Sequence, residues 1–224
     1  MEIAKTPEII YEDNHLLVVV KPQGIPVQKA ESSNDDFQSL LKDYLKRKYD
    51  KPGNVFLGIV HRLDQPVGGV MLFAKTSKAA SRLSEQIRQN LWKKQYLAVV
   101  DGIPKEKKAV LEDWLVKNEE KNEVYVSKKG DPKAKFARLS YEALGSKNGR
   151  SLLKITLETG RAHQIRVQLS TRGLPIVNDH KYNKNSKNIA DIALWAYSVE
   201  IIHPVTKEKL VFSKEMPENM RKLM

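Results

Sequence analysis

Short apolar runs, many of them rich in β-branched residues and bounded by turn residues, recur along the whole chain. Such runs are typical of β-strands. They predict strands at residues 16–20, 55–61, 70–74, 96–100, 136–143, 151–158, 194–202 and 209–213. Helical spacing of apolar residues is rarer and predicts helices at 37–47, 76–90 and 162–172. Strands outnumber helices without alternating with them, which predicts an α+β fold with a mixed, mostly antiparallel sheet and flanking helices.

The length and composition indicate a folded, basic protein. The chain has 224 residues, of which 41% are hydrophobic, and no linker-like segment divides it, so we expect a single domain over residues 1–224. Lysine and arginine number 39 against 27 acids, a net charge of +12, which favours a polyanionic partner such as RNA, DNA or an anionic membrane. Cysteine is absent, which excludes disulfides, thiolate catalysis and cysteine metal sites.

The same sequence gives no sign of membrane insertion or export. No apolar run approaches the roughly 20 residues that span a bilayer, and the N-terminal residues do not resemble a signal peptide. We therefore expect a soluble, cytoplasmic protein with no membrane partner.

Three stretches carry groups suited to chemistry. Asp64 follows a predicted strand in His61-Arg62-Leu63-Asp64 and precedes a Pro/Gly turn, which is a good place to fix a carboxylate in a cleft; a turn-capping role is the alternative. Arg161 and Arg166 lie where a glycine turn leads into a predicted helix, a geometry that suits an anion, although such arginines are often only solvated. Tyr96 begins a strand after two lysines, where a packing role is the alternative.

A fourth stretch, residues 117–135, is dense in charge and contains Lys128, Lys129, Gly130, Asp131 and Pro132. We interpret it as a solvated loop. The alternative is an RNA-contacting hairpin in which residues 123–127 pair as a short strand.

In combination, these motifs resemble the RluA family of pseudouridine synthases over nearly the whole chain. The segment 11–27 looks like that family's first motif, and residues 61–64 look like its catalytic motif. Residues 160–166, followed by 173–176, Asp179 and Tyr182, are similar to its third motif, and His203-Pro204 matches the usual C-terminal segment. Four ordered motifs with compatible spacing make the resemblance specific.

The resemblance implies an enzyme that isomerises selected uridines of structured ribosomal or transfer RNA, with no cofactor and no metal. Asp64 would be the catalytic carboxylate, acting as nucleophile or as stabiliser of a cationic sugar. Tyr96 would stack on the target base, and Arg166 would pair with Asp64. Arg62 would fill the space left by the flipped uridine, with a local salt bridge as the alternative. The other expected RNA-binding residues are His61, Arg161, His163 and Ile165, the last with core packing as its alternative.

The sequence departs from the family pattern at two turns. Gly68-Gly69 stands where the family commonly has Ser-Gly, and Asn178-Asp179 stands where it often has Gly-Asp. Because the first motif begins near Tyr11, we also expect no N-terminal S4-type RNA-binding domain, and we expect a stand-alone monomer without an obligate protein partner.

Two other classes of function are compatible with parts of the sequence. A metal-dependent nuclease would draw its ligands from His61, Asp64, His163, Asp179, His180 and His203, although no HExxH pattern or carboxylate cluster is present. A basic RNA-binding protein without catalysis would use the same positive charge, but would have no need of Asp64, Tyr96 and Arg166 together.

Overall fold

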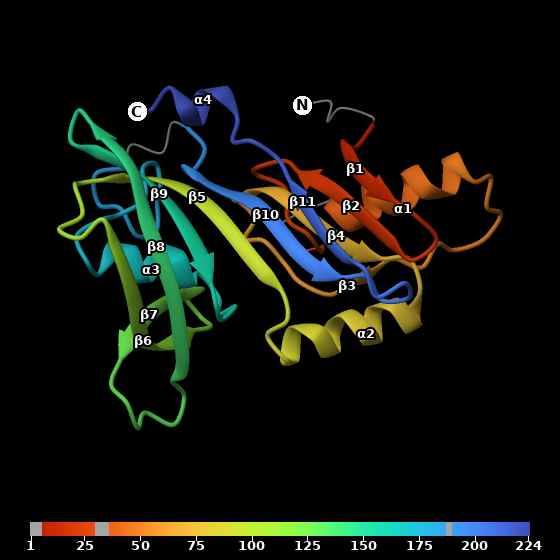
Figure 1. The fold of residues 1–224 in the computed structure, drawn as a ribbon, viewed down its shortest axis with the longest axis horizontal. Helices are drawn as coiled ribbons and strands as arrows, with labels where there is room; N and C mark the ends of the chain where they lie inside the picture. Colours follow the sequence, from red (N-terminus) through yellow and green to blue (C-terminus); the bar gives the residue numbers. More distant parts are fainter. Residues whose placement is uncertain (1–5, 30–35, 187–189) are drawn as a thin grey trace. The chain divides into compact units, whose positions relative to one another are not determined.

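The structure is a computed structural model that describes residues 6–29, 36–186 and 190–224. Its contacts divide the chain into two compact units, each with its own strands and helices (Figure 1). The first unit comprises Met1–Trp92 and Ser198–Lys214, and the second comprises Lys93–Tyr197 and Glu215–Met224. The chain passes from the second unit to the first within one strand, β10 (Leu194–Ile202).

The first unit is built on an antiparallel sheet. Strand β2 (Leu16–Lys21) lies between β1 (Ile9–Glu12) and β4 (Gly68–Ala74). The two-residue strand β3 (Gly58–Ile59) pairs with the end of β4, and β11 (Lys209–Ser213) pairs with Ser198–Ile202 of β10. Helices α1 (Phe37–Lys48) and α2 (Ser77–Arg88) complete the unit.

Side-chain caps and an apolar face fix the helices of the first unit. The side chain of Asp36 accepts a hydrogen bond from the amide of Ser39 at the start of α1, and Thr76 does the same for Ala79 at the start of α2. Helix α2 packs on β4 and buries Ala79 and Leu83. The buried core there is formed by Leu16, Val18, Val70, Leu72, Ala74, Ala79, Leu83, Trp92, Val199, Ile201 and Phe212.

His203, singled out in the sequence with Pro204, has a structural role in the first unit. Its Nδ1 accepts from the amides of Val205 (3.3 Å) and Thr206 (2.9 Å), so Nε2 carries the proton and donates to Asp13 Oδ2 at 2.9 Å. The ring is 3% exposed. This contact ties the β1–β2 turn to the β10–β11 turn.

The second unit contains a five-stranded antiparallel arrangement in the order β5-β9-β8-β6-β7. Its strands are β5 (Lys93–Asp101), β6 (Lys108–Asn118), β7 (Glu123–Ser127), β8 (Lys135–Lys147) and β9 (Arg150–Leu157). Helix α3 (Gln164–Ser170) contacts β6 and β7, and the short helix α4 (Glu218–Arg221) lies near the C-terminus.

The predicted α+β class with a mixed, mostly antiparallel sheet and flanking helices is confirmed, and every strand pair with a described register runs antiparallel. Strands 194–202 and 209–213 have the predicted bounds. Among the helices of the described residues, none has the length and apolar character needed to cross a bilayer.

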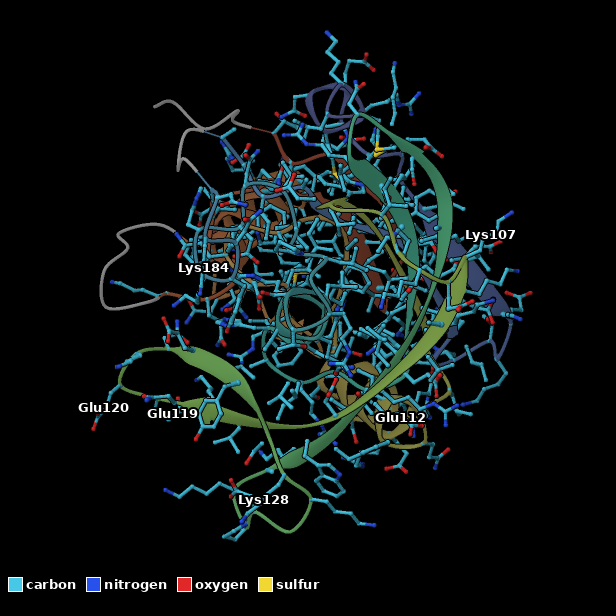
Figure 2. All side chains as sticks on the ribbon, turned by 90° about the vertical axis from the view of Figure 1, so that its left-hand side faces the viewer. Lys107, Glu112, Glu119, Glu120, Lys128 and Lys184 are labelled. Atoms are coloured by element: carbon cyan, nitrogen blue, oxygen red, sulfur yellow. The ribbon has the colours of Figure 1, made fainter. Side chains whose placement is uncertain are left out.

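Three local predictions are corrected, and strand β1 is one of two strands that were not predicted. The predicted strand 55–61 is reduced to Gly58–Ile59, and the predicted helix 162–172 begins at Gln164 and ends at Ser170. Strand β6 had no counterpart in the prediction. Residues 123–127 are not loop: they pair with β6 as a hairpin strand, whereas residues 128–134 lie between β7 and β8. That this hairpin contacts RNA stays a prediction. Figure 2 shows Glu119 and Glu120 at the β6–β7 turn and Lys128 in the β7–β8 loop.

Candidate active site

Asp64 lies in the loop that leads from β3 into β4 of the first unit. The amide of Val67 donates to the carbonyl oxygen of Asp64 at 3.0 Å and closes a tight turn through Pro66. Leu63 and Val67, on either side, are 6% and 2% exposed and anchor the loop in the core, whereas Asp64 itself is half-buried. This arrangement holds a carboxylate at the surface of a rigid loop.

The buried Lys21 side chain holds this loop through hydrogen bonds to its backbone. The side chain is 0% exposed, and its Nζ donates to three backbone carbonyls: Pro22 at 2.9 Å, Gln65 at 3.1 Å and Val67 at 2.8 Å. These bonds use all three donors of an ammonium group. Burial lowers the pKa of Lys21 to about 7, and the nearby Asp64 carboxylate opposes that shift. The last residue of β2 thereby holds the carbonyls on both sides of Pro66.

His61 extends the pairing of the two-residue strand β3. Its Nε2 accepts from the amide of Leu72 on β4 at 3.0 Å, which requires the neutral ring with the proton on Nδ1. The ring also meets Trp92 edge-on, with centroids 5.3 Å apart. Arg62, the next residue, is exposed and lines a cavity of about 730 Å³. The structure thus gives His61 a structural contact and leaves Arg62 facing solvent.

Arg166 lies in α3 of the second unit and forms a buried, bidentate ion pair with Asp179. Its Nε donates to Oδ2 at 2.8 Å and its Nη2 donates to Oδ1 at 2.7 Å. The side chains are 6% and 0% exposed. The interpretation of Arg166 as a solvated arginine on an exposed helix face is therefore wrong. Asn178, which precedes Asp179, has φ of +61°, in the left-handed region. Asparagine tolerates this conformation, and glycine, which is common at this position in the family, adopts it freely.

Tyr182 connects Arg166 to the β6–β7 hairpin. The Arg166 guanidinium lies over the Tyr182 ring, 5.1 Å from its centroid. The Tyr182 hydroxyl accepts from the amide of Val124 on β7 at 2.7 Å and contacts His163 Nδ1 at 2.8 Å. The hydroxyl of one tyrosine therefore joins the start of α3 to β7.

The Gln164 side chain ties the start of α3 to the residues before it and to β8. The Gln164 Oε1 accepts from the Arg161 amide at 3.0 Å and from Thr159 Oγ1 at 2.8 Å, and its Nε2 donates to the Arg138 carbonyl at 3.0 Å. His163, at the cap position, has φ of +48°. With only 7 residues the helix has little dipole, so we assign no anion site to its start.

The remaining predicted residues also lie in the second unit. Tyr96 is on β5, opposite Ile155 of β9, and is 8% exposed. Ile165 is 5% exposed, as its core-packing alternative requires. Arg161 is exposed, and its Nε donates to the Phe136 carbonyl at 2.8 Å.

The ligands of the nuclease alternative are dispersed. Within the described part of the chain, no group of three or more His, Asp or Glu side chains could hold a metal ion. Most of them have protein partners instead: His61 contacts Leu72, His163 contacts Tyr182, His180 contacts Ser186 at 2.7 Å, and Asp179 contacts Arg166.

Comparison with known proteins identifies the family. The model of the RNA pseudouridylate synthase family matches residues 15–171. The chain belongs to this family. It is 32% identical to the "Uncharacterized RNA pseudouridine synthase YhcT" of Bacillus subtilis (strain 168), covering 96% of this chain and 70% of that protein. It is 34% identical to the "Ribosomal large subunit pseudouridine synthase C" of Buchnera aphidicola subsp. Baizongia pistaciae (strain Bp), covering 92% of this chain and 65%, just under two thirds, of that protein.

A solved structure supports the fold. Human RNA Pseudouridylate Synthase Domain Containing 4 superimposes with a TM-score of 0.81 at 22% sequence identity, covering 96% of this chain and 90% of that one. The predicted resemblance to the RluA family and to the pseudouridine synthase fold is confirmed.

No structural contact was assigned to Lys21 or to Asp179 from the sequence. Lys21 and Asp179 both stood within motifs, Val20-Lys21-Pro22 and Asn178-Asp179. A lysine at the end of an apolar strand is a candidate for burial, and a buried lysine needs several hydrogen-bond acceptors. This local signal could have identified Lys21. Nothing local in the sequence indicates that Asp179 pairs with Arg166.

Proposed function

We propose that this protein isomerises specific uridines of structured RNA to pseudouridine, with the Asp64 carboxylate as its catalytic group. The observation that carries the proposal is the loop around Asp64, which Lys21 holds through the carbonyls of Gln65 and Val67 within the matching family segment. The relatives named as ribosomal large subunit pseudouridine synthases favour ribosomal RNA as the substrate. Transfer RNA is the alternative substrate.

The reaction needs no redox change. The N1–C1′ bond of the uridine breaks, the uracil turns over, C5 forms the new bond to C1′ and loses its proton, and N1 gains a proton. Asp64 would either attack C1′ or stabilise the cationic sugar, and the uridine must first leave its stack. Tyr96 would contact the base, and Arg62 would take the place of the extruded nucleotide.

Other parts of the proposal rest on the sequence alone. We propose that residues 1–224 work as one catalytic domain, as a cytoplasmic monomer, and that Arg161 and His163 contribute to RNA binding. For His61 and Ile165 the contacts described above favour structural roles that shape the site.

The test of Asp64 separates catalysis from folding. Asp64→Ala removes the carboxylate, so pseudouridine formation on RNA from cells lacking the gene should fall below detection, while the melting temperature changes little. Loss of a turn-capping aspartate costs about 0.5–2 kcal/mol of stability. Glu85→Ala, which removes a half-exposed carboxylate on α2, is the matched control and should keep full activity. Turnover by a folded Asp64→Ala protein would refute the assignment. RNA binding without turnover by the wild type would favour the non-catalytic alternative.

The prediction that Arg166 keeps Asp64 ionised stays a prediction and has its own test. Arg166→Met should lose single-turnover activity severely, because it removes the guanidinium that would pair with the Asp64 carboxylate. Arg166→Lys keeps the charge without the planar fork and should be intermediate. Asp179→Asn supplies the comparison: it keeps the guanidinium but removes the charge that holds it, so it should lower stability by about 3–5 kcal/mol. Near-normal rates for Arg166→Met at neutral pH would contradict the role.

A further inference from the structure

A cavity of about 730 Å³ opens in the first unit beside the loop that carries Asp64. One wall is the continuous segment 54–62, which ends at Arg62, and the opposite wall includes Gln38 and Lys42 of α1. The volume lies within the range of sites that take small organic ligands. Two residues of extended chain span at most about 7 Å, so a ligand at Arg62 is close along the backbone to Asp64.

The charge of the cavity selects the kind of ligand. Among the described residues that line it, Lys42 and Arg62 are cationic and none carries a carboxylate. The lining also includes the exposed amides of Gln28 and Asn54, groups able to donate to and accept from a nucleobase edge. A cationic, amide-bearing cavity without acids fits a phosphate-linked, hydrogen-bonding ligand.

An aromatic side chain lies at the same wall. Phe56 is 51% exposed, although its neighbour Leu57 is 2% exposed. The Phe56 ring rests against the backbone of Gly58: a Cβ atom added there would come within 3.3 Å of Cε1 and Cζ of the ring. One side of the ring is thus supported, and much of the side chain faces solvent, as a stacking platform requires.

The wall that carries Phe56 is fixed to α1. Gln38 Nε2 donates to the carbonyl of Leu57 at 2.7 Å, and Leu57 inserts into the core. Phe56 and Lys42 are therefore held on two elements that a direct hydrogen bond joins. Such preorganisation lowers the entropic cost of binding.

We propose that this cavity is a subsite for an unpaired RNA nucleotide that neighbours the target uridine. Its base stacks on Phe56, and a flanking phosphate contacts Lys42. The inference rests on the proposed function for the identity of the RNA, and it assigns to the first unit a part in choosing which uridine is modified.

The base contact is tested with short single-stranded probes. Fluorescein-labelled tetranucleotides of adenosine or uridine, and an abasic ribose-phosphate tetramer, are titrated against the protein by fluorescence anisotropy. Phe56→Ala should weaken binding of the base-containing probes about 5- to 100-fold, because one stacking contact is lost. Phe56→Tyr should retain it. The abasic probe should not distinguish these variants. Leu91→Ala, which removes another exposed apolar side chain of the same unit, is the matched control.

The phosphate contact is tested by salt dependence. Lys42→Ala should lower the slope of log affinity against log salt by about 0.7, the value for one phosphate of a single strand. Lys46→Ala, one helical turn further along α1 and outside the lining, is the matched control and should leave the slope unchanged.

These measurements separate the subsite from the proposed function. If the wild type makes no pseudouridine but Phe56→Ala still weakens binding, the enzyme assignment fails and the RNA subsite stands. If Phe56→Ala binds like the wild type, or the wild type does not prefer bases to the abasic probe, the subsite is overturned whatever the activity.

Discussion

The protonation of Lys21 is coupled to folding. Its three acceptors are carbonyls of its own neighbour and of the Asp64 loop, and burial lowers its pKa from 10.5 to about 7. The unfolded chain therefore holds this proton to higher pH than the folded protein does. Folding stability should rise as pH increases from about 7 to about 10.5, and Lys21 should add no pH dependence below that window.

The prediction is measurable as a difference between two proteins. From pH 7 to 10 the unfolding free energy of the wild type should increase relative to that of Lys21→Met, by at most about 4 kcal/mol at 1.36 kcal/mol per pH unit. Lys46→Met, at an exposed position, controls for general effects of alkaline pH and should run parallel to the wild type. Parallel curves for the wild type and Lys21→Met would show that the buried amine titrates normally.

At the residue scale, the sequence indicated candidate site residues but not their contacts. Asp64, Tyr96 and Arg166 were found through ordered motifs, and the proposals still depend on them. The partners of Lys21 were not predictable, because Gln65 and Val67 lie 44 and 46 residues away. Likewise, the Arg166–Asp179 pair spans two motif segments that only the fold after α3 brings together.

At the element scale, predictions succeeded where local signals agreed. Helix α2 has both a capping threonine and an apolar face, and it begins where predicted, at Ser77 after Thr76. Helix α3 is shorter than predicted because Arg161 and Thr159 bond to the Gln164 side chain and His163 takes a left-handed conformation. Strand β6 was missed because charged residues interrupt its apolar positions, and its pairing with β7 and β8 decides its structure.

Tyr182→Phe tests whether its hydroxyl couples β7 to α3. The substitution removes the acceptor for the Val124 amide and the contact with His163, while the ring under Arg166 is kept. The Val124 amide should then exchange with solvent faster, by a factor that corresponds to about 1–2 kcal/mol, as measured by hydrogen exchange. Tyr141→Phe, whose hydroxyl donates to the Glu106 carbonyl at 3.4 Å, is the control. Unchanged Val124 exchange would show that β6–β7 pairing alone protects it.

At the scale of the whole molecule, net charge can be calculated from the sequence alone, without knowledge of the fold. A net charge of +12 predicts that RNA binding is largely electrostatic. The affinity for a minimal stem-loop carrying the target uridine should fall by roughly one decade per tenfold rise in salt for each phosphate neutralised. The same stem-loop should be modified at an undiminished rate in EDTA, since the candidate metal ligands His163, Asp179 and His203 each bond to a protein partner. The assays are equilibrium binding from low to high potassium chloride and pseudouridine release with and without chelator. Activity that disappears in EDTA and returns with a transition metal would support the nuclease-like alternative, and affinity insensitive to salt would show that base contacts outweigh the backbone.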